Sequence, residues 1–201
     1  MKFLGAIAVS SVCAFCYVPV ASADSCDSIV KAVQATEHTE RRRVRTQMLQ
    51  GGKPVAIPEA IIVPEGMFQK TGDQWVRNPF SPNSAGLRAL AGTPTYADCR
   101  LVRSERLNGV AADVYSARVS TTGGVTGKSV SDTLIWVSKS DGLAQQIESR
   151  IADRNTTVTQ VYNYGPEVRA PAGATHGADA SAPGLEVPAA IGGVIKGLLG
   201  K

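Results

Sequence analysis

The chain has 201 residues and a formal net charge of +4, and 43% of the residues are hydrophobic, 5% aromatic and 19% charged. This composition is typical of a globular domain and excludes a chain that is disordered or collagen-like as a whole. The slight excess of basic residues gives no reason to expect a nucleic acid partner. Two histidines and four cysteines leave little material for metal or acid–base chemistry, so we expect neither a metal nor a cofactor.

Residues 1–23 have the features of a secretory signal peptide. One charge, on Lys2, precedes an apolar run that begins at Phe3, and the segment ends in the small residues Ala21-Ser22-Ala23. Signal peptidase cleaves after such a pattern. A buried helix and a membrane anchor are the alternatives, although the apolar run is short and Pro19 interrupts it. A valine and a phenylalanine precede the two cysteines of this segment, so lipidation is not expected.

Two cysteines remain after cleavage, Cys26 and Cys99. Export would place them in an oxidising compartment, where an even pair most often forms a disulfide. Their spacing matches no zinc or redox motif. We therefore predict a bridge between them, with two free buried thiols as the alternative.

The first half of the exported chain is predicted to begin with a helix and to continue as strands. Helical spacing of apolar residues follows two capping residues, and from Arg41 onwards apolar and polar residues alternate instead. The expected elements are a helix over 25–38, a strand from about 41 to the Gly51-Gly52 turn, strands over 55–63 and 66–77, a break at 78–83 and a short helix over 84–91. The basic run over 41–45 is interpreted as a solvated face, with contact to an anionic lipid surface as the alternative.

Two hairpins are predicted in the second half. Asn108-Gly109 separates strands over 99–107 and 110–121, and Asp141-Gly142 separates strands over 130–140 and 143–152. Both dipeptides favour two-residue turns. A last strand is expected over 156–164, which completes an antiparallel meander with an N-terminal helix.

A two-residue turn at Asp141-Gly142 would pair Ser140 with Leu143 and so fix the register of the second hairpin. That register places four apolar side chains on one face of the sheet. They are Leu134, Trp136, Leu143 and Ile147. These residues are our candidates for a ligand-binding wall, and an ordinary hydrophobic core is the alternative.

Four segments carry a resemblance to a known family by their order and spacing. They are Cys99-Arg-Leu-Val, Leu107-Asn-Gly-Val-Ala-Ala-Asp-Val-Tyr115, Ile135-Trp-Val-Ser138 with Asp141-Gly-Leu143, and Tyr162-x-Tyr164-Gly-Pro-Glu-Val168. Over about residues 26–171 the chain resembles exported bacterial proteins of the lipoprotein-carrier superfamily, the LolA/LolB/LppX-like group. The resemblance implies an α+β fold, a curved antiparallel half-barrel with an N-terminal helix packed against it and a hydrophobic cavity between them.

The same resemblance implies a periplasmic protein without enzymatic activity that carries or senses an apolar ligand of the lipid or acyl-chain class. No serine, cysteine or histidine lies in a recognisable catalytic motif. The alternative is a structural or regulatory adaptor of the cell envelope, whose C-terminal helix contacts a membrane or a protein. The sequence does not indicate the ligand, the partner or the oligomeric state.

The C-terminal region is predicted to lie outside the domain of residues 24–170. Residues 171–188 are rich in Ala, Pro and Gly and are interpreted as a linker. Residues 189–201 carry an apolar stripe at helical spacing, formed by Ile191, Val194, Ile195, Leu198 and Leu199. A short amphipathic helix on a membrane surface or a partner is one interpretation, and docking on its own domain or fraying is the other.

Overall fold

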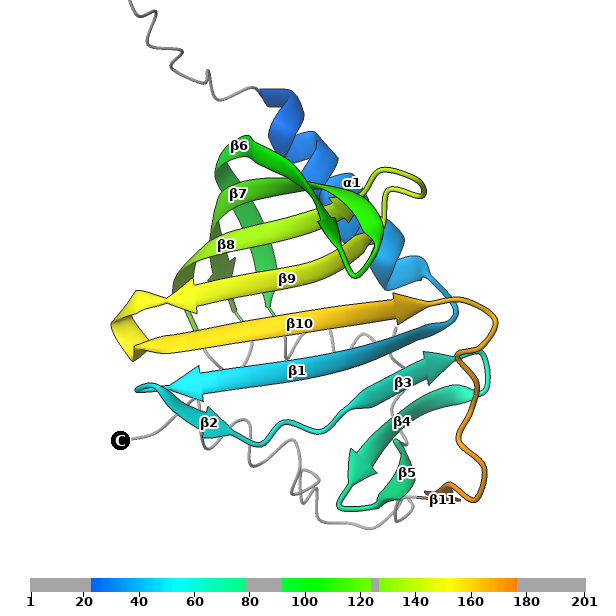
Figure 1. The fold of residues 1–201 in the computed structure, drawn as a ribbon. Helices are drawn as coiled ribbons and strands as arrows, with labels where there is room; N and C mark the ends of the chain where they lie inside the picture. The colour runs from blue at the N-terminus through cyan, green and yellow to red at the C-terminus, as the bar shows by residue number, and fades with distance from the viewer. Residues whose placement is uncertain (1–22, 79–91, 124–126, 177–201) are drawn as a thin grey trace, which may run out of the picture.

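The computed structural model describes residues 23–78, 92–123 and 127–176. Within these ranges the chain forms an N-terminal helix and one curved sheet (Figure 1). The predicted signal peptide up to residue 22, the predicted helix over 84–91 and the predicted tail helix over 189–201 lie outside the described residues. No helix of the described part is long and apolar enough to cross a membrane.

The helix and the strands follow the sequence closely. In chain order they are α1 (Ala23–His38), β1 (Arg42–Gln50), β2 (Lys53–Val55), β3 (Ala60–Val63), β4 (Gly66–Thr71), β5 (Gln74–Asn78), β6 (Thr93–Leu107), β7 (Val110–Thr122), β8 (Ser129–Ser138), β9 (Ala144–Ile151), the 3-10 turn η1 (Ala152–Arg154), β10 (Thr156–Tyr164) and β11 (Thr175–His176). The predicted helix and the strand predicted over 156–164 are confirmed. The strand predicted over 66–77 is divided into β4 and β5 by a turn in which Gly72 has a positive φ of 60°.

The sheet runs in the order β11-β5-β4-β3-β1-β10-β9-β8-β7-β6, and β2 pairs with β1 beside this path. Strands β6 to β10 form the predicted meander, and β1 pairs with β10 over nine residue pairs. All pairs are antiparallel except β11 with β5. Together with α1 this arrangement confirms the predicted α+β half-barrel.

The Asn108-Gly109 hairpin forms as the sequence predicts. Leu107 pairs with Val110, so the turn has two residues. Asn108 and Gly109 have φ angles of 50° and 86°. Two positive φ angles in succession define the type I′ turn, which matches the right-handed twist of the strands and which Asn-Gly adopts with little strain.

The predicted two-residue turn at Asp141-Gly142 is wrong. β8 ends at Ser138 and β9 begins at Ala144, and the amide of Ser138 donates to the carbonyl oxygen of Leu143 over 2.9 Å. A register shift also lies between Trp136 and Val137. The longer connection moves the pairing by two residues and keeps the faces, whereas the one-residue register shift exchanges the face of β9 that Trp136 and Leu134 share.

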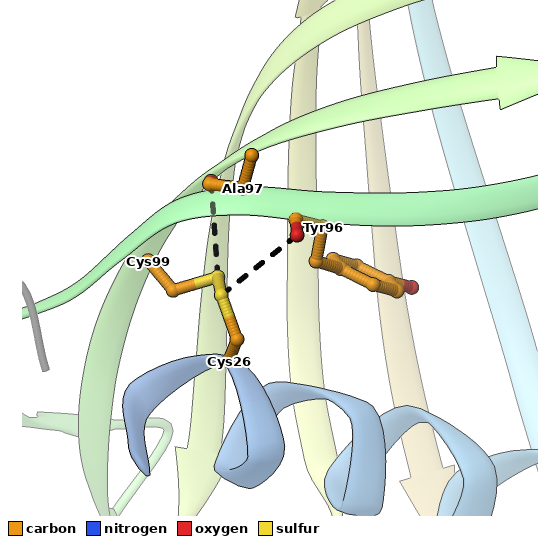
Figure 2. The surroundings of a disulfide bond; sticks show 4 residues. All are labelled: Cys26, Tyr96, Ala97 and Cys99. Atoms are coloured by element: carbon orange, nitrogen blue, oxygen red, sulfur yellow. Dashed lines mark hydrogen bonds between the residues drawn. A yellow bond between two sulfur atoms is a disulfide. The ribbon is translucent and has the colours of Figure 1, made fainter. Parts of the chain in front are cut away.

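Helix α1 lies against β6, β7, β8 and β9. The Cys26–Cys99 disulfide forms, with 5.1 Å between the two Cα atoms, and it joins the N-terminal part of α1 to β6 (Figure 2). Between the helix and the sheet Ile29, Ile135 and Ala144 are buried almost completely. The predicted bridge between Cys26 and Cys99 is therefore confirmed.

A second core lies on the other side of the sheet, over β3 and β4. Ile61, Val63 and Phe68 pack there against Val168, which follows β10. Residues 171–176, the beginning of the predicted linker, remain on the domain, since β11 pairs with β5. The remainder of the predicted linker, from residue 177, lies outside the described residues.

Candidate ligand-binding site

The four residues predicted to share one wall do not lie together. Ile147 pairs with Ile135 and joins the core beneath α1, whereas Trp136 pairs with Gln146 and points to the opposite face. Leu134 lies on the same face as Trp136. Leu143 lies in the connection between β8 and β9. The predicted pairing of Trp136 with Ile147 is wrong for this reason, although Trp136 is buried as expected, with 5% of its surface exposed.

Trp136 belongs to a small cluster on the face of the sheet away from α1. It packs against Ala112 and Val114, with Leu107 and Leu134 at the border. The guanidinium of Arg103 lies 5.9 Å from the centre of the Trp136 ring. The indole nitrogen of Trp136 donates a hydrogen bond to the carboxylate of Glu105. Residues from β6 thus cover the indole. These contacts indicate a structural role for Trp136 on this face.

The side of the sheet that faces α1 continues beyond the helix. α1 lies mainly against β6 to β9 and reaches β10 and β1 near its C-terminal end, whereas the same side of the sheet continues over β10, β1 and β3 (Figure 1). In β1 the predicted alternation is confirmed, because Val44 and Met48 lie on this side and Gln47 is exposed on the other. Val44 pairs with Tyr162, and Met48 with Val158.

This extension, which we call the inner face, carries half-buried apolar and aromatic side chains at alternate positions of neighbouring strands. They are Val44, Ala60, Met67, Val76, Ile147, Val158 and Tyr162. Fully packed core residues in the same sheet are far less exposed, such as Ile135 at 1%. Met48 and Ile62 on the same side are buried, at 5% and 8% exposed, and Ile147 also packs against the core beneath α1, so the inner face is only partly open.

Polar contacts fix the C-terminal part of α1 beside the inner face. The hydroxyl of Thr36 accepts a hydrogen bond from the amide of Ala144 over 2.9 Å. The hydroxyl of Tyr164 donates to the carbonyl oxygen of Ala144 and also contacts Thr36 over 3.2 Å. Burial raises the pKa of Tyr164 to about 12, so this phenol is neutral at physiological pH. α1 is thus joined to the sheet by a disulfide near one end and by a hydrogen-bonded cluster near the other.

The basic run over 41–45 is not one uniform solvated face. The guanidinium of Arg41 donates to a carbonyl oxygen of the segment after β10, and Arg42 is buried, with 9% exposed. Arg43 and Arg45 point away from the inner face, and their Nε atoms lie 3.4 and 3.1 Å from a carboxylate oxygen of Glu59. The interpretation as a solvated face therefore fails for Arg42, which folds under the end of α1.

A shallow groove of about 670 Å³ lies over β6 to β9 on the face away from α1. Its charged residues are Asp98, Arg100, Arg118, Asp132, Glu148 and Arg150. Arg118, Asp132 and Arg150 pair in register across three neighbouring strands. With acidic and basic groups in equal number, the groove has no net charge that would select a ligand of one sign.

The described residues contain no cluster of three or more His, Cys, Asp or Glu side chains that could hold a metal ion. His38, at the end of α1, forms a hydrogen bond of 2.7 Å between its Nδ1 and the carbonyl oxygen of Gln34. His176 lies in β11, at the far end of the sheet from β6. The two histidines therefore lie in different parts of the fold.

Sequence reasoning missed Arg42, Thr36 and the pair Tyr162 and Tyr164 as residues of one site. The two tyrosine rings stack with their centres 6.2 Å apart and their planes 4° from parallel. The spacing of two within a predicted strand could have indicated that they share a face. Thr36 and Arg42 gave no such signal, because only the packing of α1 on the sheet brings them beside the tyrosines.

The chain matches no protein-family profile and no curated protein. Solved structures with a similar arrangement include the Mycobacterium tuberculosis lipoprotein LppX, at 9% identity, over 70% of this chain and 93% of that one, with a TM-score of 0.44. LprF from Mycobacterium bovis is similar at 12% identity, over 76% of this chain and 97% of that one, with a TM-score of 0.44. A LolA superfamily protein from Nitrosomonas europaea aligns at 9% identity, over 70% of this chain and 92% of that one, with a TM-score of 0.23.

LppX and the LolA superfamily protein bear names of the LolA/LolB/LppX-like group that the sequence motifs resemble. At such identities and scores the likeness concerns the arrangement of the helix and the sheet. It does not extend to a ligand or a partner.

Proposed function

We propose that this protein is a non-enzymatic carrier or sensor of an apolar ligand of the lipid or acyl-chain class, and that it works in the periplasm. The observation that carries the proposal is the inner face, where half-buried apolar side chains continue beyond the cover of α1. Ligand sites are mostly apolar surfaces with few polar groups, and such a surface binds by burial without covalent chemistry. The disulfide is consistent with an exported protein.

The proposed wall differs from the one expected from sequence. Ile147 belongs to both the expected and the proposed wall, because it lies on the side of the sheet that faces α1. Val44, Val158 and Tyr162 replace Leu134, Trp136 and Leu143, because the register of β1 with β10 brings them together on that side. An acyl chain along β1 and β10 would contact these residues.

Native mass spectrometry of the protein after mild extraction tests this proposal. We expect a co-purifying lipid or fatty acid, and we expect Val158→Asp to lose it while Val161→Asp keeps it. Both valines lie in β10, but Val161 pairs with Arg45 and Gln146 and points to the opposite face. Loss of the bound lipid in both variants, or its absence from the wild type even after incubation with fatty acid, would contradict the proposal.

The adaptor function remains as a second proposal and depends on the tail. Its support is the spacing of Ile191, Val194, Ile195, Leu198 and Leu199, which lie outside the described residues. Vesicle flotation of the full protein and of a form that ends at Glu186 tests it. We expect only the full protein, and not the form that ends at Glu186, to float with anionic vesicles at low salt. Equal behaviour of the two forms would contradict membrane binding by the tail.

A further inference from the structure

Arg42 is a buried cation at the end of the inner face. It lies in β1 on the side that faces α1, opposite Tyr164 in register. Its Nη1 donates to the carbonyl oxygens of Glu37 and Thr39, over 2.8 and 2.6 Å. These carbonyl groups belong to the C-terminal end of α1 and to the residue after it. Burial lowers the pKa of Arg42, whereas the electrostatic effects of Tyr162, Tyr164 and Glu37 act to raise it.

The negative charge that faces Arg42 does not balance it. The C-terminus of a helix acts as about half of a negative charge. None of the ion pairs among the described residues includes Arg42, and Glu37 is exposed and contributes its carbonyl group to the contact. Among the described residues both hydrogen bonds of Arg42 come from Nη1, and Nε and Nη2, which have no protein acceptor there, are not fully buried and are open to solvent.

The surroundings of Arg42 are neutral donors and aromatic rings. Burial raises the pKa of Tyr162 and of Tyr164, and the charge of Arg42 acts in the opposite direction on both, so the guanidinium lies near the two phenols. Both hydroxyls already have partners, Gln160 for Tyr162 and Ala144 for Tyr164. The tyrosines therefore do not supply the missing negative charge.

The apolar part of the inner face begins next to Arg42. Val44 is the next residue of β1 on the same side, and Met48 follows two positions beyond Thr46. At about 3.3 Å per residue the strand from Arg42 to Met48 is about 20 Å long. A cation thus lies at one end of a strip that is as long as an extended acyl chain. In this strip the polar pair of Thr46 and Gln160 separates the apolar residue Val44 from Met48 and Val158.

We propose that Arg42 binds the anionic end group, a carboxylate or a phosphate, of an acyl ligand whose chain lies along Val44 and Val158. This inference rests on the proposed function and specifies its ligand as an anionic amphiphile. The free Nε and Nη2 of Arg42 donate to two oxygens of the end group, as guanidinium groups do with carboxylates and phosphates. The buried cation then has the counter-charge that the described residues do not provide.

Binding of palmitate and of methyl palmitate, measured by displacement of a fluorescent neutral lipid, tests the proposal. The two ligands have the same chain and differ in the charge of the end group. Hydrogen bonds to a charged group contribute about 1.5–3 kcal/mol, so we expect palmitate to bind about 10- to 100-fold more tightly. Hexadecyl phosphate, measured in the same way, distinguishes a phosphate from a carboxylate as the preferred end group.

The variants separate the end group from the chain. In Arg42→Gln we expect palmitate to lose its advantage while methyl palmitate keeps its affinity. Arg45→Gln, a change on the opposite face of the same strand, should leave both affinities unchanged. Arg42→Lys keeps the charge and should retain part of the preference for palmitate over methyl palmitate. If Arg42→Gln does not fold, a reduced preference in Arg42→Lys supports the role of Arg42, and an unchanged preference contradicts it.

The possible failures are distinguishable. Equal affinity of the wild type for palmitate, hexadecyl phosphate and methyl palmitate would overturn the role of Arg42 and leave the carrier function intact. A preference for the anions that persists in Arg42→Gln would also overturn it. Binding of none of the three ligands to the wild type would contradict the proposed function itself.

Discussion

Removal of the Cys26–Cys99 disulfide is expected to lower the free energy of unfolding by about 4 kcal/mol. The two cysteines are 73 positions apart in the sequence. In the chain-entropy model, closing a loop of this length in the unfolded chain stabilises the folded state by roughly 4.4 kcal/mol at 25 °C. Since domains are stable by about 5–15 kcal/mol, this is a large share of the total.

The double variant Cys26→Ala/Cys99→Ala, unfolded in urea and followed by circular dichroism, measures this contribution. The wild type under reducing conditions is the matched control and should lose a similar amount, because it lacks the same covalent link. Cys99 is 2% exposed, so the alanine variant also loses some packing and should be slightly less stable than the reduced wild type. A loss below about 1 kcal/mol in both the alanine variant and the reduced wild type would contradict this prediction, because it would show that the disulfide does not restrict the unfolded chain.

Three further predictions concern stability. Thr36→Val should cost about 1–3 kcal/mol in urea unfolding, because it leaves the buried amide of Ala144 without its acceptor; an unchanged midpoint would show that another group replaces the hydroxyl. Trp136→Ala should lower the free energy of unfolding by about 3–5 kcal/mol. The control Leu101→Ser, at a side chain that is 48% exposed, should change it by less than about 0.5 kcal/mol. Equal effects of the two substitutions would show that Trp136 is not buried. Burial raises the pKa of Tyr164 to about 12, so the unfolded chain, with a pKa near 10, releases this proton first; the stabilisation is complete below about pH 10 and is lost as the pH rises through about 12. Thermal unfolding between pH 9 and 12 should therefore show a shallower decline in Tyr164→Phe, and an identical slope would contradict this assignment.

The parts of the fold that were predictable from sequence are those that depend on local chemistry. The Asn108-Gly109 turn needs two positive φ angles, which this dipeptide adopts readily, and the hairpin followed as predicted. The disulfide followed from export and from an even number of cysteines. The alternation in β1 predicted which of its side chains share a face.

The second hairpin shows why the candidate wall could not be predicted in the same way. Asp141-Gly142 is also a strong turn signal, but five residues connect β8 to β9, and a register shift follows Trp136. A change of one residue in register exchanges the two faces of a strand, so the register shift beside Trp136, and not the longer turn, removed Trp136 and Leu134 from the wall. Dipeptide preference alone does not determine the length of a connection.

Arg42 shows a second limit of the sequence. The alternation in β1 places it on the face of Val44, and Arg43 and Arg45 on the other face beside Glu59, but does not indicate that it is buried. Its burial under the end of α1 requires that the helix be held on the sheet by contacts distant in sequence, such as the hydrogen bond between Thr36 and Ala144. Tertiary packing, rather than local pattern, thus selects which arginine is buried.

Nuclear magnetic resonance with a spin-labelled fatty acid tests whether the ligand site lies on the inner face, because it shows which face of the sheet the ligand contacts. With a nitroxide on the acyl chain, we expect strong broadening of the methyl signals of Val44 and Val158, because both side chains lie on the inner face. The methyl signals of Val114 and Leu134, which lie on the opposite face beside Trp136, should remain sharp. Broadening of Val114 and Leu134 with sharp signals from Val44 and Val158, or no broadening at any of the four residues, would contradict a ligand site on the inner face.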